Sequence, residues 1–313
     1  MKQMINNVFW RIGLEITPDT FIQADNSICS QNNLIRRLIA GRYYGLLPYG
    51  EISDGGNTGE NGHLTFTVKA HINNRELKVE QLACYGTTEA GYLIVFDNDR
   101  LEALFKKQLL LPNANVDAFY VVLRTNPFEQ VLIEPVDNEE APEGHSYYEL
   151  CIRELDKISA DELAIIKVDN KANAPVIDSD YIPPCMSVNS CLPLVNVFGT
   201  FRNLFAEIRS IIEHKKEQFG KLMYPLTLLH FELDEFSLSE PPMTLIRLIK
   251  KFIMTYQFFI PDIRKIVLND SSGEYNHNDV AIIFRSLLSC LQEVKLIIGK
   301  VEMVIEEDFT PRI

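Results

Sequence analysis

The six histidines and six cysteines are the residues best able to bind a metal or act as nucleophiles. No two histidines have the HExxH spacing of a zinc protease, and no two cysteines have the CxxC spacing of a zinc ribbon or redox motif. The closest cysteines, Cys185 and Cys191, have five residues between them. This usage is typical of reduced, packed thiols in a reducing compartment. We therefore expect neither a structural metal nor a disulfide framework.

The common enzymatic motifs are missing from the sequence. It contains no GxSxG nucleophile elbow, no GxxxxGK[ST] phosphate loop and no GxGxxG after a predicted strand. The glycine-rich segment 54–62 lacks the carboxylate spacing of an EF-hand, and residues 97–99 (Asp-Asn-Asp) fit a solvated turn better than a cation site. A hydrolase with dispersed acids stays open, because two carboxylates can meet in space, although no motif favours one. We expect a non-enzymatic protein without a cofactor.

Composition limits the remaining classes of partner. Of 313 residues, 46% are hydrophobic, so wholesale disorder is excluded. The 43 acidic residues outnumber the 30 basic ones and give a net charge of −13, which argues against nucleic-acid binding because that binding requires cations. The N-terminus lacks a signal-peptide core. The most apolar stretch, 245–260, contains three cations and is too short to span a bilayer, so we expect a cytoplasmic location without membrane insertion.

Two halves of the chain differ in hydrophobic period. Short apolar runs separated by turn signals favour strands at 64–70, 77–84, 92–96, 119–124, 148–155 and 163–168. Asn73 and Asn74 can adopt positive φ and predict a hairpin between the first two runs. Three prolines within 181–193 mark a boundary, after which the period becomes helical.

The helical half is predicted to contain a helix from 198 to about 218, a shorter piece within 222–236, and a helix that Pro241-Pro242 opens and Pro261 ends. The predicted fold class is α+β with two segregated modules. Residues 1–185 would form an antiparallel β-sandwich, and residues 186–313 a helical bundle.

The last predicted helix, 280–305, carries an apolar seam with alternating steps of four and three residues, capped by Asn278 or Asp279. The seam residues are Val280, Phe284, Leu287, Leu291, Val294, Ile298, Val301 and Ile305. A second apolar face carries Ile282, Ile283, Leu288, Leu296, Ile297 and Val304. The seam could pack only within its own chain, but two apolar faces favour self-association, and we take Val280 to Ile298 of the seam as a candidate trimer interface.

The N-terminal segment resembles the opening motif of the TssK (VasE-like) family of type VI secretion baseplate subunits. The matching residues, in order and without gaps, are Trp10, Gly13, Pro18, Phe21, Gln23 and Asp25. The family's Gln-His after the proline is replaced by Asp19-Thr20. Segments 147–155 and 181–189 also look like the family, the second resembling its "YIPP" entry to a helical neck.

This resemblance implies a homotrimer with an N-terminal β-sandwich shell, similar to the shoulder of phage receptor-binding proteins, and a helical-bundle neck. It implies that the shell attaches to the wedge subunits TssF and TssG, and that a C-terminal head docks on an envelope-anchoring complex. Only residues 308–313 follow the last predicted helix, so we expect the head to be missing, which puts that docking in question. The six motif residues are candidate partner contacts, with Trp10 and Phe21 alternatively core anchors of the β domain.

Two further surfaces stay open at this point. A ligand-binding β-module for a carbohydrate or peptide could use Tyr43, Tyr44 and Tyr49 beside the 54–62 loop. Residues 129–180 carry fourteen acidic and four basic residues, a net charge of −10. That stretch would be either a solvated rim or a surface that attracts a basic partner.

Overall fold

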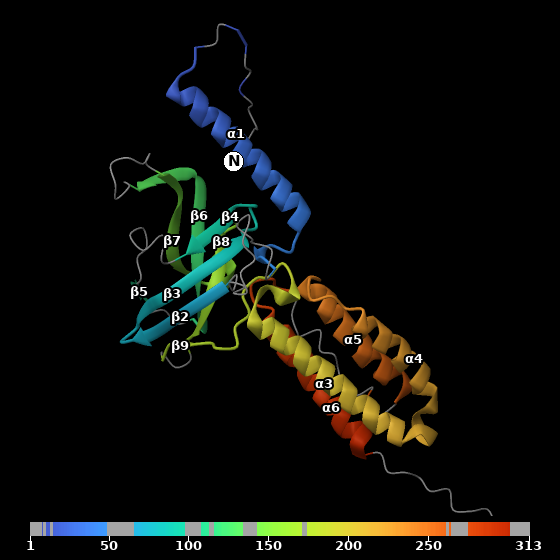
Figure 1. Cartoon of the computed structure of the whole chain (residues 1–313). Coiled ribbons are helices and arrows are strands. Elements are labelled where there is room, and N and C mark those ends of the chain that lie inside the picture. The colour runs from blue at the N-terminus through green and yellow to red at the C-terminus, as the bar shows by residue number, and fades with distance from the viewer. Residues whose placement is uncertain are drawn as a thin grey trace, which may run out of the picture. The chain divides into compact units, whose positions relative to one another are not determined.

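The chain forms two compact units in a computed structural model. Unit 1 comprises Met1–Cys191 with His277–Asp279, and unit 2 comprises Leu192–Asn276 with Val280–Ile313 (Figure 1). The structure describes residues 8, 11–12, 15–48, 66–97, 108–112, 116–133, 143–170, 174–260, 263 and 275–300. The chain therefore passes from one unit to the other three times, the last two times around a tripeptide that belongs to unit 1.

The first sheet of unit 1 is antiparallel and centres on β3 (Glu76–Thr87). That strand pairs with β1 (Gly45–Leu46), β2 (Phe66–Asn73), β4 (Leu93–Asp97) and β5 (Gln108–Leu110). Alternate side chains of β3 are buried because successive residues of a strand face opposite sides. Asn74 and Arg75 have φ of 47° and 64°, and they close the predicted β2–β3 hairpin with the left-handed backbone that such turns need.

The second sheet has the strand order β7-β6-β8-β9 and is also antiparallel. Its strands are β6 (Ala118–Ile133), β7 (Glu143–Arg153), β8 (Glu162–Asp169) and β9 (Val176–Ile177). The first seven residues of β8 are all buried, so this strand is covered on both faces. Two short 3₁₀ turns, η2 (Leu155–Lys157) and η4 (Val188–Ser190), follow β7 and β9 respectively. The strands predicted at 77–84, 92–96, 119–124 and 163–168 are confirmed and lie inside their observed strands to within a residue, and the one predicted at 148–155 ends earlier, at Arg153. Residues 66–70 of the first predicted strand lie in β2, and residues 64 and 65 lie outside the described residues.

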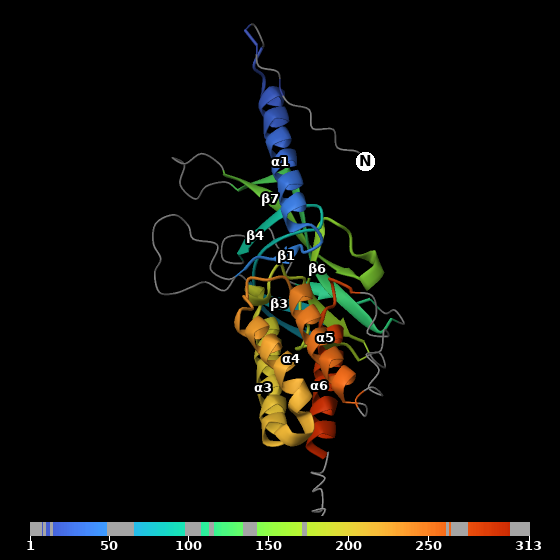
Figure 2. The ribbon, with the colours of Figure 1, turned by 90° about the vertical axis from the view of Figure 1, so that its right-hand side faces the viewer.

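A helix that the sequence pattern did not predict opens unit 1. Helix α1 spans Pro18–Ala40, with Pro18 in its first turn and a capping box between Thr17 and Thr20. Proline fits the first helical turn because its missing N–H would be unpaired there in any case. Only Ser27, Asn33 and Ala40 of this helix are buried. Much of α1 stands clear of the strands of its unit (Figures 1 and 2).

Unit 2 contains α3 (Leu192–His214), α4 (Lys216–Asp234), α5 (Pro242–Phe259) and α6 (Ala281–Lys300). Helix α3 packs on α4 and α6, and α5 packs on the same two helices, as both ribbon views show (Figures 1 and 2). Phe205 and Phe252 meet edge to face with ring centroids 4.3 Å apart in the apolar core. The chain is thus a mixed α+β protein with antiparallel sheets and, among the described residues, five α-helices.

The boundaries of the helices correct the sequence prediction at three places. The helix expected to reach residue 218 ends at His214, because Lys215 has non-helical φ and ψ (−107° and 36°). Helix α4 continues through Pro225, although proline removes one backbone hydrogen bond, and it is kinked at Phe219. The Val280 carbonyl accepts the first bond of α6 from Phe284 N, so neither Asn278 nor Asp279 is its N-cap. No described helix is both long enough and apolar enough to cross a membrane.

Candidate interaction surfaces

The predicted seam of α6 lies in the core of unit 2. Its six described residues, taken as the candidate trimer interface, are each no more than 1% exposed: Val280, Phe284, Leu287, Leu291, Val294 and Ile298. Helices α3 and α5 of the same chain cover this side of α6. In the single chain the seam therefore packs within its own chain. A contact between copies through the same seam stays a prediction. Val301 and Ile305 lie outside the described residues.

The second apolar face of α6 is only partly covered. Ile283 is buried and Leu288 and Ile297 are half-buried, whereas Ile282 and Leu296 are 52% and 61% exposed. Val304 lies outside the described residues. Two exposed side chains on one helix are ordinary for a protein surface and do not by themselves make an interface.

Four of the six residues of the N-terminal motif lie on α1. Pro18, Gln23 and Asp25 are exposed, and Phe21 is 57% exposed. Phe21 is therefore not a core anchor of the β domain, and that alternative is wrong for this residue. Trp10 and Gly13 lie outside the described residues. The Thr-Pro sequence at 17–18 is a helix-start signal from which α1 could have been predicted.

The tripeptide His277–Asp279 is held inside unit 1 by aromatic residues. Tyr44 Oη donates to Asn278 Oδ1 at 3.0 Å, and Tyr181 Oη donates to the Asn278 carbonyl at 2.9 Å. His277 Nε2 donates to the Tyr44 carbonyl, and the two rings meet edge to face at 4.7 Å. Burial lowers the pKa of His277 to about 4 and raises the pKa of Tyr44 to about 12, so both side chains are neutral near pH 7.

This arrangement weakens the interpretation of unit 1 as a ligand-binding module. Tyr44 is only 9% exposed and is engaged by the tripeptide, and the ring of Tyr43 packs edge to face with His277 at 6.3 Å. Tyr49 and the 54–62 loop lie outside the described residues. The two described tyrosines that the sequence offered for ligand contact serve instead to fix a chain segment.

A buried ion pair lies beside the tripeptide. Asp279 Oδ2 accepts hydrogen bonds from Lys167 Nζ and from Tyr120 Oη, each at 2.8 Å, while Lys167 Nζ also lies 3.8 Å from Asp178 Oδ2. Burial, with the nearby Asp279 carboxylate, raises the pKa of Tyr120 well above its usual range, so the phenol remains a donor. No sequence pattern links these residues, because 112 positions separate Lys167 from Asp279.

The acidic stretch 129–180 is not simply a solvated rim. Glu162 is 2% exposed and accepts from Arg153 Nε at 3.0 Å and from Ser159 N at 2.9 Å. Asp178 pairs with Lys167, and Asp161 pairs with Arg124 at 2.9 Å. Several of these charges therefore stabilise unit 1 internally. The acids that remain available to a basic partner are fewer than the sequence suggests.

The cysteines behave as packed thiols. The sulfur atoms of Cys185 and Cys191 lie 3.5 Å apart, and no disulfide joins them. Burial raises the pKa of the Cys185 thiol well above its usual range, which keeps the thiol protonated and poorly nucleophilic. Among the described residues, no three His, Cys, Asp or Glu side chains are grouped to hold a metal ion.

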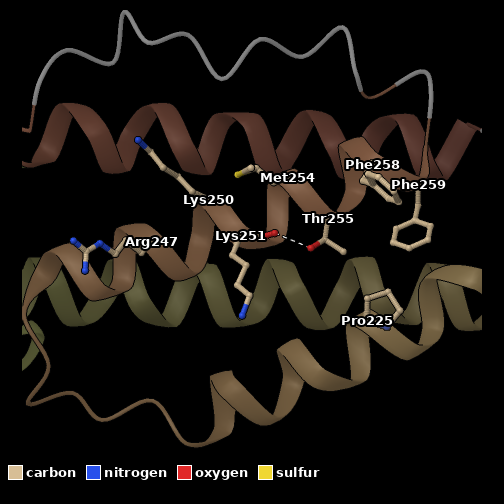
Figure 3. Close-up of a pocket in the computed structure, with 8 residues that line it drawn as sticks. All are labelled: Pro225, Arg247, Lys250, Lys251, Met254, Thr255, Phe258 and Phe259. Atoms are coloured by element: carbon tan, nitrogen blue, oxygen red, sulfur yellow. Dashed lines mark hydrogen bonds between the residues drawn. The ribbon is translucent and has the colours of Figure 1, made fainter.

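A shallow groove of about 520 Å³ runs between α4 and α5 in unit 2 (Figure 3). Its lining residues are Pro225, Arg247, Lys250, Lys251, Met254, Thr255, Phe258 and Phe259. Met254 and Phe258 are 60% and 71% exposed, so the apolar lining is open to solvent. An apolar lining with cations at one end has the chemistry to accept an acidic, amphipathic segment. None of the described lining residues is a carboxylate that could perform hydrolysis.

Comparison with solved structures decides the fold. A chain of the TssK-TssF-TssG baseplate subcomplex of the type VI secretion system, solved by cryo-electron microscopy, matches with a TM-score of 0.58 over 94% of this chain and 99% of that one. The chain has the TssK fold. A crystal structure of TssK gives the same TM-score over 93% of this chain and 69% of that one, and TssK from EAEC bound to a nanobody gives 0.55 over 87% and 68%.

The likeness to TssK lies in the structure and hardly in the sequence. Identities to these three chains are 16%, 12% and 14%. Scans of the sequence against protein-family models and against curated proteins find no match. At such low identity the likeness shows the fold alone. Partners and assembly have to be argued from this chain's own residues.

Proposed function

We propose that this chain is a structural baseplate subunit of a type VI secretion machine, not an enzyme, and that it acts on the cytoplasmic side of the envelope. The observation that carries the proposal is the match, over nearly the whole chain, to a chain of a TssK-TssF-TssG baseplate subcomplex and to TssK itself. The motif residues Trp10 to Asp25 support it independently, because they depend on side-chain identity and not on the path of the backbone. A protein that works by assembly needs extended surfaces, and α1 and the α4–α5 groove supply them.

The finer architecture of the proposal follows the two units. Unit 1 would be a β-sandwich shell like the shoulder of phage receptor-binding proteins, supported by its two antiparallel sheets. Unit 2 would be a helical-bundle neck, supported by the mutual packing of α3, α4, α5 and α6.

The proposed partners are two further copies of the chain, the wedge subunits TssF and TssG, and an envelope-anchoring complex. Unit 1 would attach to the wedge, since the residues of the family motif that are described lie exposed on α1. The neck would carry the connection towards the envelope anchor. A nucleic-acid partner does not fit a net charge of −13.

Two measurements on the full-length protein test this proposal. Light scattering coupled to gel filtration at micromolar concentration is expected to give the mass of three chains, and a single-chain mass would contradict the trimer. Affinity capture of the chain co-expressed with TssF and TssG from the same genome is expected to retain both. The variant that tests the family motif is Trp10→Ala, which removes the largest side chain of that motif. It is expected to weaken capture of TssF and TssG, while the mass of the isolated protein stays the same. If the Trp10→Ala variant still captures both wedge subunits, Trp10 does not contribute to the contact.

A further inference from the structure

The α4–α5 groove of unit 2 has an aromatic end and a cationic end (Figure 3). Phe258 and Phe259, both exposed, line the aromatic end together with Pro225. Arg247 and Lys250 line the other end, and among the described residues neither of them forms an ion pair. A groove divided in this way suits a segment whose own apolar and acidic residues are divided in the same order.

The cationic end of the groove lies towards the C-terminal end of α4. Lys251, which also lines the groove, pairs with Glu232, two residues before α4 ends. Phe258 lies further along α5 and lines the groove with Pro225, which comes seven residues earlier in α4. The two helices are therefore antiparallel, and the aromatic end of the groove is the one nearer the start of α4. The Glu232 contact also shows that a carboxylate is accommodated beside these cations.

The end of α6 is held beside the start of α4. Lys215, the residue before α4, donates from Nζ to the carbonyl oxygens of Ile298 and Gly299, at 3.1 and 3.0 Å. After Lys300 the chain continues with the segment 301–313, which lies outside the described residues. That segment therefore begins on the side of the bundle to which the aromatic end of the groove is nearer.

The order of residues in segment 301–313 matches the order of surfaces in the groove. Four of its first five residues, 301–305, are apolar, and residues 306–308 are Glu, Glu and Asp. Over its whole length it carries four acidic residues and one basic residue. A chain that enters the groove at the aromatic end brings its apolar residues to that end first and its acids to Arg247 and Lys250 afterwards. Opposite charges placed in this way favour one direction of binding.

The segment is long enough to reach both ends of the groove. Pro225 lies ten residues after Lys215, a distance of at most about 15 Å along a helix, and Arg247 lies about 18 Å from Phe259 along α5. Thirteen residues in an extended conformation span up to about 45 Å. A segment joined to α6 by so short a connection has an effective concentration in the groove in roughly the millimolar range, so a weak fit is enough to keep it bound.

We propose that segment 301–313 of this chain binds in its own α4–α5 groove. Its apolar residues 301–305 contact the aromatic end, and its acids 306–308 pair with the cationic end. A bound segment covers exposed aromatic side chains of α5, and a partner that presents an acidic, amphipathic segment has to displace it before it can use the groove. This inference goes beyond the proposed baseplate role, and it holds or fails independently of that role.

A fluorescent peptide with the sequence of residues 301–313 tests the groove directly by anisotropy. In the full-length triple variant Glu306→Lys, Glu307→Lys and Asp308→Lys, the chain's own segment is repelled by the cations, and the peptide is expected to bind with a Kd of roughly 0.1 mM. In the wild type the chain's own segment occupies the groove, so the peptide is expected to bind about tenfold more weakly. No binding to the triple variant, or equal binding to both proteins, would overturn the proposal.

Reversing the charge of the groove should reverse which peptide it accepts. Full-length protein with Arg247→Glu and Lys250→Glu is expected to reject the native peptide and to bind a peptide in which residues 306–308 are lysines. The matched control is Lys69→Glu with Arg202→Glu, because both side chains are exposed and neither lines the groove, and it should behave as the wild type. Circular dichroism melting verifies that each variant is folded. If the groove variant keeps the preference of the wild type, the peptide binds elsewhere and the inference is wrong.

A pair of cysteines shows whether the segment reaches the groove of its own chain. Thr255 lines the groove, and Thr255→Cys combined with Ile305→Cys is expected to form an intramolecular disulfide on mild oxidation. The matched control is Thr200→Cys with Ile305→Cys, since Thr200 lies on α3 and its hydroxyl donates to the carbonyl four residues earlier, as that of Thr255 does. Mass spectrometry of proteolytic peptides identifies the linked residues, and the wild type, with its six cysteines, reports the background.

Mixtures of the single variants identify any other occupant. Thr255→Cys and Ile305→Cys on separate chains are expected to link no more than the wild type does. Linkage between separate chains, without linkage inside the double variant, would identify a second copy as the occupant and overturn the assignment to the same chain. Equal linkage of the Thr255 and Thr200 double variants would mean that segment 301–313 does not select the groove.

Discussion

Lys167 Nζ lies 2.8 Å from Asp279 Oδ2, and the two side chains are 9% and 3% exposed. Lys167 is on β8, whereas Asp279 reaches unit 1 only after the chain has formed α3, α4 and α5. Tyr120 of β6 donates to the same carboxylate oxygen. Burying a charge pair costs much of its hydration, but an unpaired buried charge costs more, so the pair specifies where the tripeptide 277–279 is bound.

Removing one member of this pair is expected to destabilise unit 1 more than removing both. Asp279→Ala leaves the Lys167 ammonium without its closest partner in a buried site, and the free energy of unfolding should fall by roughly 3 kcal/mol. Lys167→Met combined with Asp279→Leu removes the charges of both side chains and should recover part of that loss, although Asp178 then loses its more distant partner at 3.8 Å. The measurement is urea unfolding followed by circular dichroism.

An exposed ion pair supplies the control for these variants. Lys295 and Glu207 lie 2.9 Å apart, with side chains 38% and 53% exposed, and Lys295→Met should change stability by less than about 0.5 kcal/mol. Equal losses for Asp279→Ala and for the double variant would mean that the site depends on packing and not on charge pairing.

The stability of unit 1 should depend on pH through His277. Burial lowers its folded-state pKa to about 4, whereas an unfolded histidine titrates near 6.5. Below pH 6.5 the unfolded chain therefore binds a proton that the folded chain refuses, so stability is complete above pH 6.5 and falls by up to roughly 3 kcal/mol as the pH approaches 4. Unfolding free energies at pH 7, 6, 5 and 4.5 measure this slope.

The variant that isolates this effect is His277→Gln, whose amide can still donate to the Tyr44 carbonyl but does not titrate. Its stability should change less between pH 7 and 4.5 than that of the wild type, while the exposed His214→Gln should follow the wild type. If the unfolding free energy changes equally with pH in all three proteins, the pH dependence comes from the carboxylates and not from His277.

The strands of unit 1 could be predicted because each buries one face and so leaves an alternating pattern in the sequence. Residues 66–70 and 77–84 lie in β2 and β3, and the hairpin closes at Asn74 and Arg75, one residue after the predicted pair Asn73-Asn74, because Asn73 still belongs to β2. The network around Asp279 could not be predicted. Its partners Lys167 and Tyr120 lie more than 100 residues away, and a polar contact of that range leaves no periodic signal.

Helices α6 and α1 show two other limits of prediction from the sequence. The stripe of α6 is visible in the sequence, but a stripe alone does not say whether its own chain or a copy covers it, and α3 and α5 do so here. Helix α1 was not predicted, although Thr17-Pro18 marks its start, because Ala24 and Gln31 interrupt its apolar pattern. The large aromatic ring of Phe21 also suggested a β core, where the structure does not place it.

Gly91 is expected to be required for the position of α1. It has φ of 84°, and an added Cβ would lie 2.2 Å from the Asn33 carbonyl oxygen, so Gly91→Ala forces α1 to shift. Amide hydrogen exchange of residues 18–40 should become faster, by roughly tenfold or more, while β3 and β8 stay protected. Gly41→Ala is the control, since Gly41 also has positive φ, of 56°, but nothing within 4 Å of the added Cβ. Equal acceleration in both variants would mean that backbone strain, not the contact with Asn33, is responsible.

Substitutions of Phe284 and Ile282 distinguish a role of α6 in the core of unit 2 from a role in an interface. Phe284 is 1% exposed and Ile282 is 52% exposed, two positions apart on the same helix. Phe284→Ala leaves a cavity among α3, α5 and α6, and should lower the free energy of unfolding by roughly 3 to 5 kcal/mol even at concentrations where the protein is a single chain. Ile282→Ala should change that energy by less than about 0.5 kcal/mol. If instead the loss for Phe284→Ala disappears on dilution, the α6 seam stabilises a contact between copies and not the core of the single chain.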